Sequence, residues 1–264
     1  SEILGKTIDV EGNTFASIRT AVKNADSGDT IRLSGKYSAE KAFDQITLHK
    51  KIKFTADSKA TLDGKGITHI FVVQKDAKGS SFNNLNIING YRNGRSSGLY
   101  VNATDVTVSN CLFKNNKAFS GTSICTEYDN YSAKNLKIEN CQFINNHAER
   151  SAAAIGAFGD NTRILNCLFD SNGASNRDDI TPYGGAIQIG LDGYLSRCYV
   201  TGCKFINNYV APDNSGAHGG AGCVRDGIEY KDCIFINSNS RFDGCFIYVS
   251  SYTNLNLTLN ITRQ

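Results

Sequence analysis

The chain has 264 residues, of which 40% are hydrophobic, and its formal net charge is +3 at pH 7. So small a charge, carried by dispersed lysines and arginines, argues against a nucleic-acid-binding protein. No apolar run approaches the roughly twenty residues that a membrane-spanning helix needs, so we expect no direct insertion into a membrane.

The first 28 residues are predicted to cover one end of the fold. Phe15, Ile18, Ala21 and Val22 fall on one face of a short helix over residues 14–25, and such a face packs on a core. A repeat protein needs its ends covered, because an exposed core and unpaired strand edges lead to aggregation. We therefore assign residues 1–28 to an N-terminal cap.

After short strands and turns over residues 29–74, one sequence pattern recurs along the chain. Asn110-Cys-Leu-Phe-Lys-Asn-Asn116 returns as NCQFINN, NCLFDSN, GCKFINN and DCIFINS, and its cysteines are 30, 26, 36 and 30 residues apart. A fixed core pattern with variable length is typical of a solenoid with insertions in its loops. The repeated cysteines are Cys111, Cys141, Cys167, Cys203 and Cys233.

Each copy of the pattern reads as a strand followed by a turn. Alternation places Cys111 and Phe113 on one side, and Val108, Leu112 and Lys114 on the other. We expect the cysteine and phenylalanine columns to point inward and to stack about 4.8 Å apart from coil to coil. The Asn residues that follow suit a tight bend, where their amides can bond to neighbouring coils. The phenylalanine column is Phe113, Phe143, Phe169, Phe205 and Phe235.

These features predict an all-β fold: a right-handed, single-stranded parallel β-helix of roughly eight coils with a short N-terminal capping helix. A leucine-rich horseshoe is excluded because its leucine spacing and helical segments are absent. We expect one domain over residues 1–264, with coils over 29–264. The last strand pair, near residues 253–262, has no evident cap, so we expect the chain to be part of a longer surface protein.

The nine cysteines are predicted to be mostly structural thiols. Five occupy the inward column, where Leu85 replaces cysteine in an earlier, degenerate copy, and free cysteine packs as a small hydrophobe. Disulfides remain the alternative, with Cys198 and Cys203 as the first pair to test. A zinc site is not supported, since no CxxC or His-rich spacing occurs.

Two long turns on neighbouring coils form the predicted binding surface. Residues 173–183 and 209–218 both follow the Asn turn, so they should project side by side, and loops on one face of a repeat protein often bind its partner. Their aromatic and polar side chains suit sugars or protein epitopes. The candidate ligand-binding residues are Asn176, Arg177, Asp178, Asp179, Tyr183, Tyr209, Asp213, Asn214 and His218.

Acidic residues support an enzymatic alternative. Asp178-Asp179 with His218 faintly resembles the pattern of polygalacturonase-type hydrolases, in which paired acids cleave a glycosidic bond. That family's Asn-Thr-Asp and Arg-Ile-Lys motifs are absent.

Asp160, Asp192 and Asp226 recur in one turn and, if stacked, could bind Ca²⁺, although turns prefer aspartate for their own geometry. We expect no cofactor and no catalysis.

The repeats resemble two groups of surface proteins. GGAI at 184–187 with FINN at 143–146 and 205–208 is similar to the repeats of chlamydial polymorphic outer-membrane proteins. The opening at 12–18, 26–33 and 60–64, followed by the xCxFxNN repeats, resembles adhesin-like proteins of methanogenic archaea.

This resemblance implies an extracellular, cell-surface β-helix that binds a surface glycan or protein of another cell. Polysaccharide lyases or glycoside hydrolases of the pectate-lyase-like type are the alternative, and a structural spacer is a third.

Overall fold

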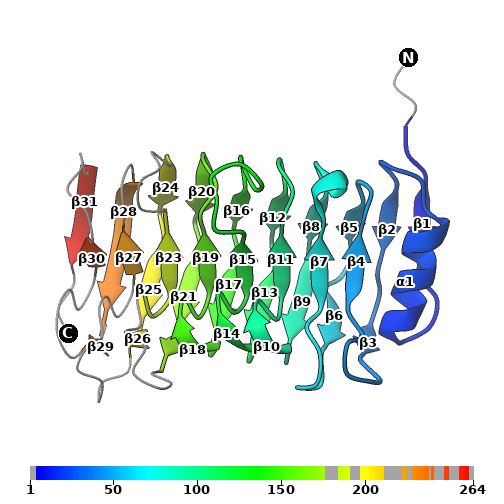
Figure 1. Ribbon diagram of the computed structural model, residues 1–264, viewed down its shortest axis with the longest axis horizontal. Helices are drawn as coiled ribbons and strands as arrows, with labels where there is room; N and C mark the ends of the chain where they lie inside the picture. Colours follow the sequence, from blue (N-terminus) through cyan, green and yellow to red (C-terminus); the bar gives the residue numbers. More distant parts are fainter. Residues whose placement is uncertain are drawn as a thin grey trace.

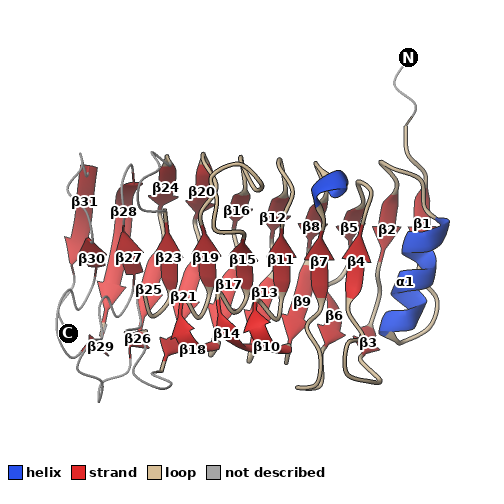
Figure 2. Cartoon of the chain, in the orientation of Figure 1, coloured by secondary structure: helices blue, strands red, loops and turns tan. Residues whose placement is uncertain are grey.

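The computed structural model describes residues 4–175, 184–190, 197–210, 222–224, 228–237, 239–240, 247–249 and 256–261. Its strands run parallel and wind into a β-solenoid of about eight turns, which confirms the predicted fold class (Figure 1). Three sheets run along the solenoid, with α1 at one end (Figure 2). No helix among the described residues is long and apolar enough to cross a membrane.

The largest sheet, sheet A, receives two strands from most coils. Its strands are β1 (Thr7–Asp9), β2 (Thr30–Arg32), β3 (Lys36–Ser38), β5 (Lys53–Thr55), β6 (Ala60–Asp63), β8 (Ser81–Asn83), β9 (Leu85–Ile88), β12 (Thr107–Ser109), β13 (Leu112–Lys114), β16 (Lys137–Glu139), β17 (Gln142–Ile144), β20 (Thr162–Leu165), β21 (Leu168–Asp170), β24 (Cys198–Thr201), β25 (Lys204–Ile206), β28 (Ile228–Ile236) and β31 (Asn256–Ile261).

Two further sheets complete the coils. Sheet B contains β4 (Ile46–Leu48), β7 (Phe71–Val73), β11 (Leu99–Val101), β15 (Ile124–Thr126), β19 (Ile155–Ala157), β23 (Ile187–Ile189), β27 (Gly222–Val224) and β30 (Ile247–Val249). Sheet C contains β10 (Tyr91–Arg95), β14 (Lys117–Ser120), β18 (His147–Ser151), β22 (Gly173–Ala174), β26 (Tyr209–Val210) and β29 (Asn239–Ser240). The short 3-10 helix η1 (Lys75–Ala77) lies between β7 and β8.

The predicted capping helix is present as α1 (Phe15–Asn24). Thr14 precedes it in an extended conformation, and its hydroxyl accepts a hydrogen bond of 3.1 Å from the backbone N–H of Ser17. This N-cap satisfies one of the donors that a helix leaves free at its start. The face with Phe15 and Ile18 is buried and packs near β4, so α1 closes one end of the core.

The phenylalanine column forms the stacked ladder that the repeat predicts. Neighbouring rings from Phe113 to Phe235 have centroids 4.6–5.0 Å apart and are parallel within 5–7°. The cysteine column beside it is buried, and every cysteine with a described side chain is a free thiol, Cys198 and Cys203 included. The thiols donate to backbone carbonyls; Cys141 Sγ, for example, is 3.3 Å from the carbonyl oxygen of Glu139.

Simple alternation was wrong for Val108, which is fully buried together with Cys111 and Phe113. Asn110 lies between β12 and β13 with a φ of 53°, in the left-handed region. A residue in that conformation turns the chain, so the alternation starts again after it. Each coil therefore has a bend inside the repeat as well as the bend after it.

The bend after the repeat is held by a ladder of buried asparagines. Asn146 Oδ1 accepts from the backbone N–H and from Nδ2 of Asn116, both at 3.1 Å, and Asn146 Nδ2 donates to the carbonyl of Phe113 at 3.0 Å. Asn172 and Asn208 repeat these contacts in the next coils. The asparagine ladder (Asn116, Asn146, Asn172 and Asn208) thus satisfies backbone groups that have no access to water.

We expect Asn146→Ala to lower the free energy of unfolding by about 3 kcal/mol, because it leaves several buried donors and acceptors without partners. Urea unfolding followed by circular dichroism measures the change. Gln142→Ala, at an exposed position on the preceding strand, is the matched control and should change stability little. Equal midpoints for the two variants would contradict a structural role for the ladder.

Candidate functional site: a polar groove along sheet C

The outward positions of sheet C form one row along the solenoid. Strand pairing aligns Tyr91 with Lys117, Lys117 with His147, His147 with Gly173, and Gly173 with Tyr209. From Lys117 onward, each of these residues follows directly on a member of the asparagine ladder. The ladder therefore fixes the row, with about 4.8 Å between successive positions.

A groove of about 1010 Å³ runs along this row. It begins at Asp63, Lys65 and Gly66, at the end of β6, and extends to Tyr209 on β26. It therefore crosses several coils of the solenoid. We call it the groove; its lining residues are Asp63, Lys65, Gly66, Asn89, Gly90, Tyr91, Asn115, Lys117, Asn145, His147 and Tyr209.

Asparagines provide one side of the groove. Asn89, Asn115 and Asn145 have φ values of 55°, 57° and 54°, a left-handed conformation that Asn tolerates better than most residues. Asn145 Nδ2 donates to Asn115 Oδ1 at 2.8 Å. The same residue type thus makes the bend and presents amide groups to the groove.

The groove carries excess positive charge. Burial alone would raise the pKa of Asp63, but hydrogen bonds from Asn89, from the Lys65 backbone and from Lys36 hold it below its usual value. Lys36 Nζ and Lys65 Nζ lie 3.1 and 3.6 Å from its carboxylate. Among the described residues, no carboxylate forms an ion pair with Lys117. A bound anionic group would therefore meet an uncompensated cation at Lys117.

His147 stands beside Lys117 in the row. Burial and then the charge of Lys117 lower the pKa of His147, so its imidazole is neutral at neutral pH. Its Nε2 lies 2.8 Å from Ser175 Oγ. When Nε2 donates to that hydroxyl, Nδ1 keeps a free lone pair, which is what a general base needs.

Tyr209 follows His147 in the row after a single glycine. A Cβ at Gly173 would lie 1.8 Å from Cζ of the Tyr209 ring, so the ring occupies the space that a side chain at Gly173 would fill. This glycine lets the phenol lie along the row toward His147. Tyr209 is a predicted binding residue, and the structure places it in the groove.

The other predicted binding residues lie outside the described residues. These are Asn176, Arg177, Asp178, Asp179, Tyr183, Asp213, Asn214 and His218.

Of the acids considered for Ca²⁺, Asp192 and Asp226 also lie outside the described part. Asp160 is engaged by Arg197, whose Nη2 is 3.0 Å from its carboxylate, and this contact lowers the pKa of Asp160. No group of three potential metal ligands occurs among the described residues.

Lys117 and His147 were not predicted as site residues. A signal for them exists in the sequence, because each directly follows the Asn pair that ends a repeat. The position directly after the Asn pair is not recognised as a column in the repeat pattern, because the residue type at this position changes from coil to coil.

No protein-family model and no curated protein matches the chain. Solved structures do match, among them a PL6 family alginate lyase, AlyGC, with a TM-score of 0.48 and 12% identity over 98% of this chain. The chain spans 40% of the length of that lyase. The expectation that the chain has no catalytic activity is corrected, because the solved structure that it resembles is that of an enzyme.

Gly173→Ala should push the Tyr209 ring off its place beside His147, because the new Cβ and the ring cannot share one space. We expect faster nitration of Tyr209 by tetranitromethane, read by peptide mass spectrometry. Tyr91, four positions away in the same row, is the internal control and should keep its rate. An unchanged Tyr209 rate would contradict the packing of the ring on Gly173.

Proposed function

We propose that the chain is a carbohydrate-active β-helix whose groove binds an acidic polysaccharide and cleaves it by β-elimination. The observation that supports this most is the order of one row: a cation, a neutral imidazole and a phenol at Lys117, His147 and Tyr209. These are the three kinds of group that the elimination of a uronic acid ester or glycoside requires.

The shape of the groove supports binding of an extended chain. From the coil of Lys65 to that of Tyr209 there are five coil steps, or about 24 Å at 4.8 Å per step. Amide groups from Asn115 and Asn145 and the rings of Tyr91 and Tyr209 suit the hydroxyls and apolar faces of sugars. Lys117, which forms no ion pair with a carboxylate among the described residues, favours a chain that bears carboxylates.

The proposed reaction uses each group once. His147 Nδ1 removes the proton on the carbon next to the uronate carboxylate, and Lys117 offsets the negative charge that then develops. The electron pair forms a carbon–carbon double bond as the glycosidic C–O bond breaks. The Tyr209 hydroxyl protonates the departing oxygen, and proton exchange with solvent restores His147 and Tyr209. No water is added, so the products are an unsaturated uronate end and a free hydroxyl end.

We propose that this activity operates at a cell surface, within a longer secreted or anchored protein. The resemblance of the repeats to adhesin-like surface proteins supports that location. The substrate would then be a glycan of another cell or of its surroundings, and attachment would accompany its processing.

The test is incubation of the protein with polygalacturonate, alginate and a neutral control such as dextran. We expect ultraviolet absorbance from the unsaturated product with an acidic polymer only. His147→Ala should lower the rate by about 10²–10⁴-fold with little change in binding, whereas His49→Ala, at an exposed position outside the groove, should keep the rate. Binding with no product from any acidic polymer would overturn cleavage and leave an attachment module.

The rate should also fall on the acid side. His147 is the base only when neutral, and its pKa lies below the ordinary 6.5. The rate should therefore still be high at pH 6.5 and should fall only as the pH drops through the lowered pKa of His147.

Lys117→Ala removes one cause of the low pKa, so the pKa of His147 should rise. Histidine NMR titration of both proteins measures it, and an equal pKa in the two would contradict the contact.

A further inference from the structure

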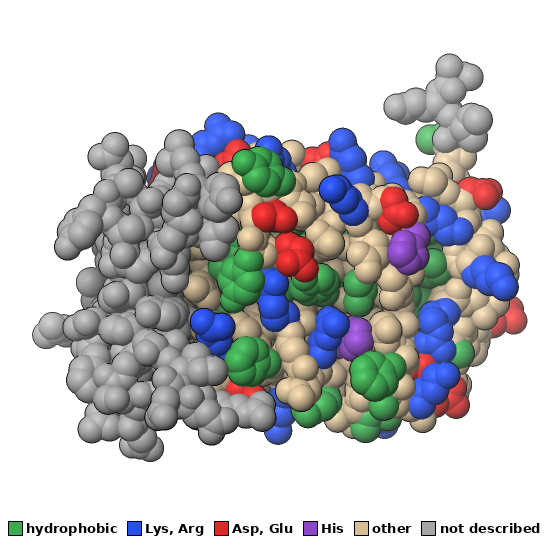
Figure 3. All heavy atoms as spheres, viewed as in Figure 1, with side chains coloured by type: hydrophobic (Ala, Val, Ile, Leu, Met, Phe, Trp, Pro, Cys, Tyr) green, Lys and Arg blue, Asp and Glu red, His purple; other side chains and the backbone are tan. Residues whose placement is uncertain are grey.

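A second set of polar groups lies across β10 from the groove. Side chains alternate along a strand, so Tyr91 faces the groove while Arg92 points to the other side, beside sheet B. Figure 3 shows this face, where hydrophobic, basic, acidic and His side chains lie among each other. We call Arg92, Arg95, His69, Tyr100 and Tyr128 the arginine cluster.

Arg95 is held in place by its own neighbours. It donates to the carbonyl of Thr126 and lies 3.4 Å from a carboxylate oxygen of Glu127. Its guanidinium carbon is 3.9 Å from the centre of the Tyr128 ring. These contacts neutralise its charge and fix its plane. Its Nε is buried and has no hydrogen-bond partner.

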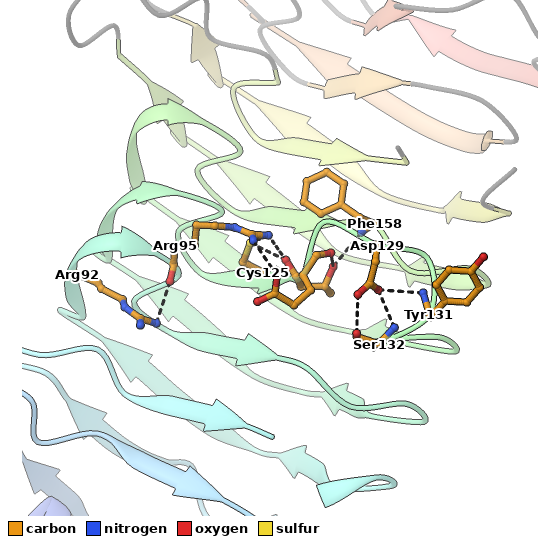
Figure 4. A network of polar contacts seen from close by, with 9 residues as sticks. Arg92, Arg95, Cys125, Asp129, Tyr131, Ser132 and Phe158 are labelled. Carbon is orange, nitrogen blue, oxygen red and sulfur yellow. Dashed lines mark hydrogen bonds and ion pairs between the residues drawn. The ribbon is translucent and has the colours of Figure 1, made fainter. Parts of the chain in front are cut away.

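Arg92 is bound much less completely. Nη1 donates to the carbonyl of Arg95 at 3.1 Å (Figure 4). The guanidinium carbon lies 5.8 Å from the centre of the Tyr100 ring. No carboxylate pairs with Arg92 among the described residues, and burial lowers its pKa. A half-buried cation without an anion is costly, so this guanidinium is suited to receive one.

The fold itself does not need an arginine at this position. Strand pairing aligns Arg92 with Ala118, Ala118 with Ala148, and Ala148 with Ala174. Three coils thus place alanine where the first strand of sheet C has arginine. The positive charge of Arg92 is therefore found in one coil only, at a position where the next three coils have a small apolar side chain.

His69 is only 6% exposed. The residue before it, Thr68, accepts a backbone hydrogen bond of 2.9 Å from Tyr91, the residue before Arg92, so the fold brings His69 and Arg92 near each other. Burial, and then the charge of Arg92, lower its pKa to about 4, so its ring is neutral at neutral pH. Among the described residues, its ring nitrogens make no hydrogen bond. The cluster therefore offers a guanidinium and an imidazole N–H with unused donors, and Arg92, Arg95 and Glu127 together carry one net positive charge.

We propose that the arginine cluster is a second ligand site, separate from the groove, that binds the carboxylate of an acidic sugar. Arg92 would take both carboxylate oxygens through its planar pair of N–H groups, and His69 would donate to a carboxylate or hydroxyl oxygen. The tyrosine rings beside it would contact the apolar part of the sugar. This assignment depends on Arg92 and His69 alone and holds whether or not the groove cleaves polysaccharide.

The test is NMR titration of the histidine ring signals of the intact protein with D-galacturonate, D-galactose and acetate. We expect the His69 signal to shift saturably with galacturonate, to shift more weakly with acetate, and to stay unchanged with galactose. His147 reports on the groove and His49 on non-specific effects, so binding in the groove alone would move His147 and not His69.

Arg92→Ala should weaken the galacturonate response of His69 at least tenfold, because a charged hydrogen-bonded pair is lost. The variant should fold, since alanine is the residue that the next coils carry in this column; its thermal midpoint checks this. Arg163→Ala, at an exposed arginine on β20, is the matched control and should bind as the unchanged protein does. A His69 signal that does not respond, acetate that binds as tightly as galacturonate, or unchanged binding by Arg92→Ala would each overturn the proposal.

Discussion

The asparagine ladder is the interaction on which the rest of this structure depends. A solenoid must bend at every coil, and a bend inside the protein leaves backbone N–H and C=O groups without water. Asn116, Asn146, Asn172 and Asn208 solve this because each amide has both donors and an acceptor. Each side chain bonds to a neighbouring coil, so one residue type satisfies the bend and ties successive coils together. Where the column begins, Gly90 takes the place of asparagine and donates its N–H to Asn116 Oδ1 at 2.8 Å.

The ladder also explains how a repetitive core can carry a varied surface. The phenylalanine and cysteine columns keep their residue type because they pack against copies of themselves. The positions directly after the ladder face outward and have no such constraint. Their backbone is fixed by the ladder, while their side chains change from Tyr91 to Lys117 to His147 along the row. A rigid row of variable side chains is a suitable frame for a binding or catalytic site.

Both proposed sites contain ionisable side chains whose charged form is opposed by burial. His147 and His69 are kept neutral by burial and by a neighbouring cation, and Arg92 is half-buried with no carboxylate partner in the part of the chain that the structure describes. Such groups lower the stability of a protein, so they are more often found where a ligand completes them. Sheet C separates the two sites, since alternate side chains of β10 point to one or to the other. The same strand thus positions Tyr91 in the groove and Arg92 in the arginine cluster.

The sequence by itself determined the solenoid, the inward columns and the capping helix, because each depends on a pattern that repeats or on an amphipathic face. Phe113 and Cys111 could be placed inside from their recurrence alone. It did not determine the bend at Asn110, since alternation along a strand gives no sign of a left-handed residue that restarts it, and Val108 was misplaced. The sequence also did not determine the groove or the arginine cluster. Lys117 and His147 are 30 residues apart in the chain, and only pairing between coils brings them together. Arg92 on β10 and His69, which precedes β7, are brought near each other by backbone pairing between Tyr91 and Thr68, and their charge states follow from burial, which exists only in the folded protein.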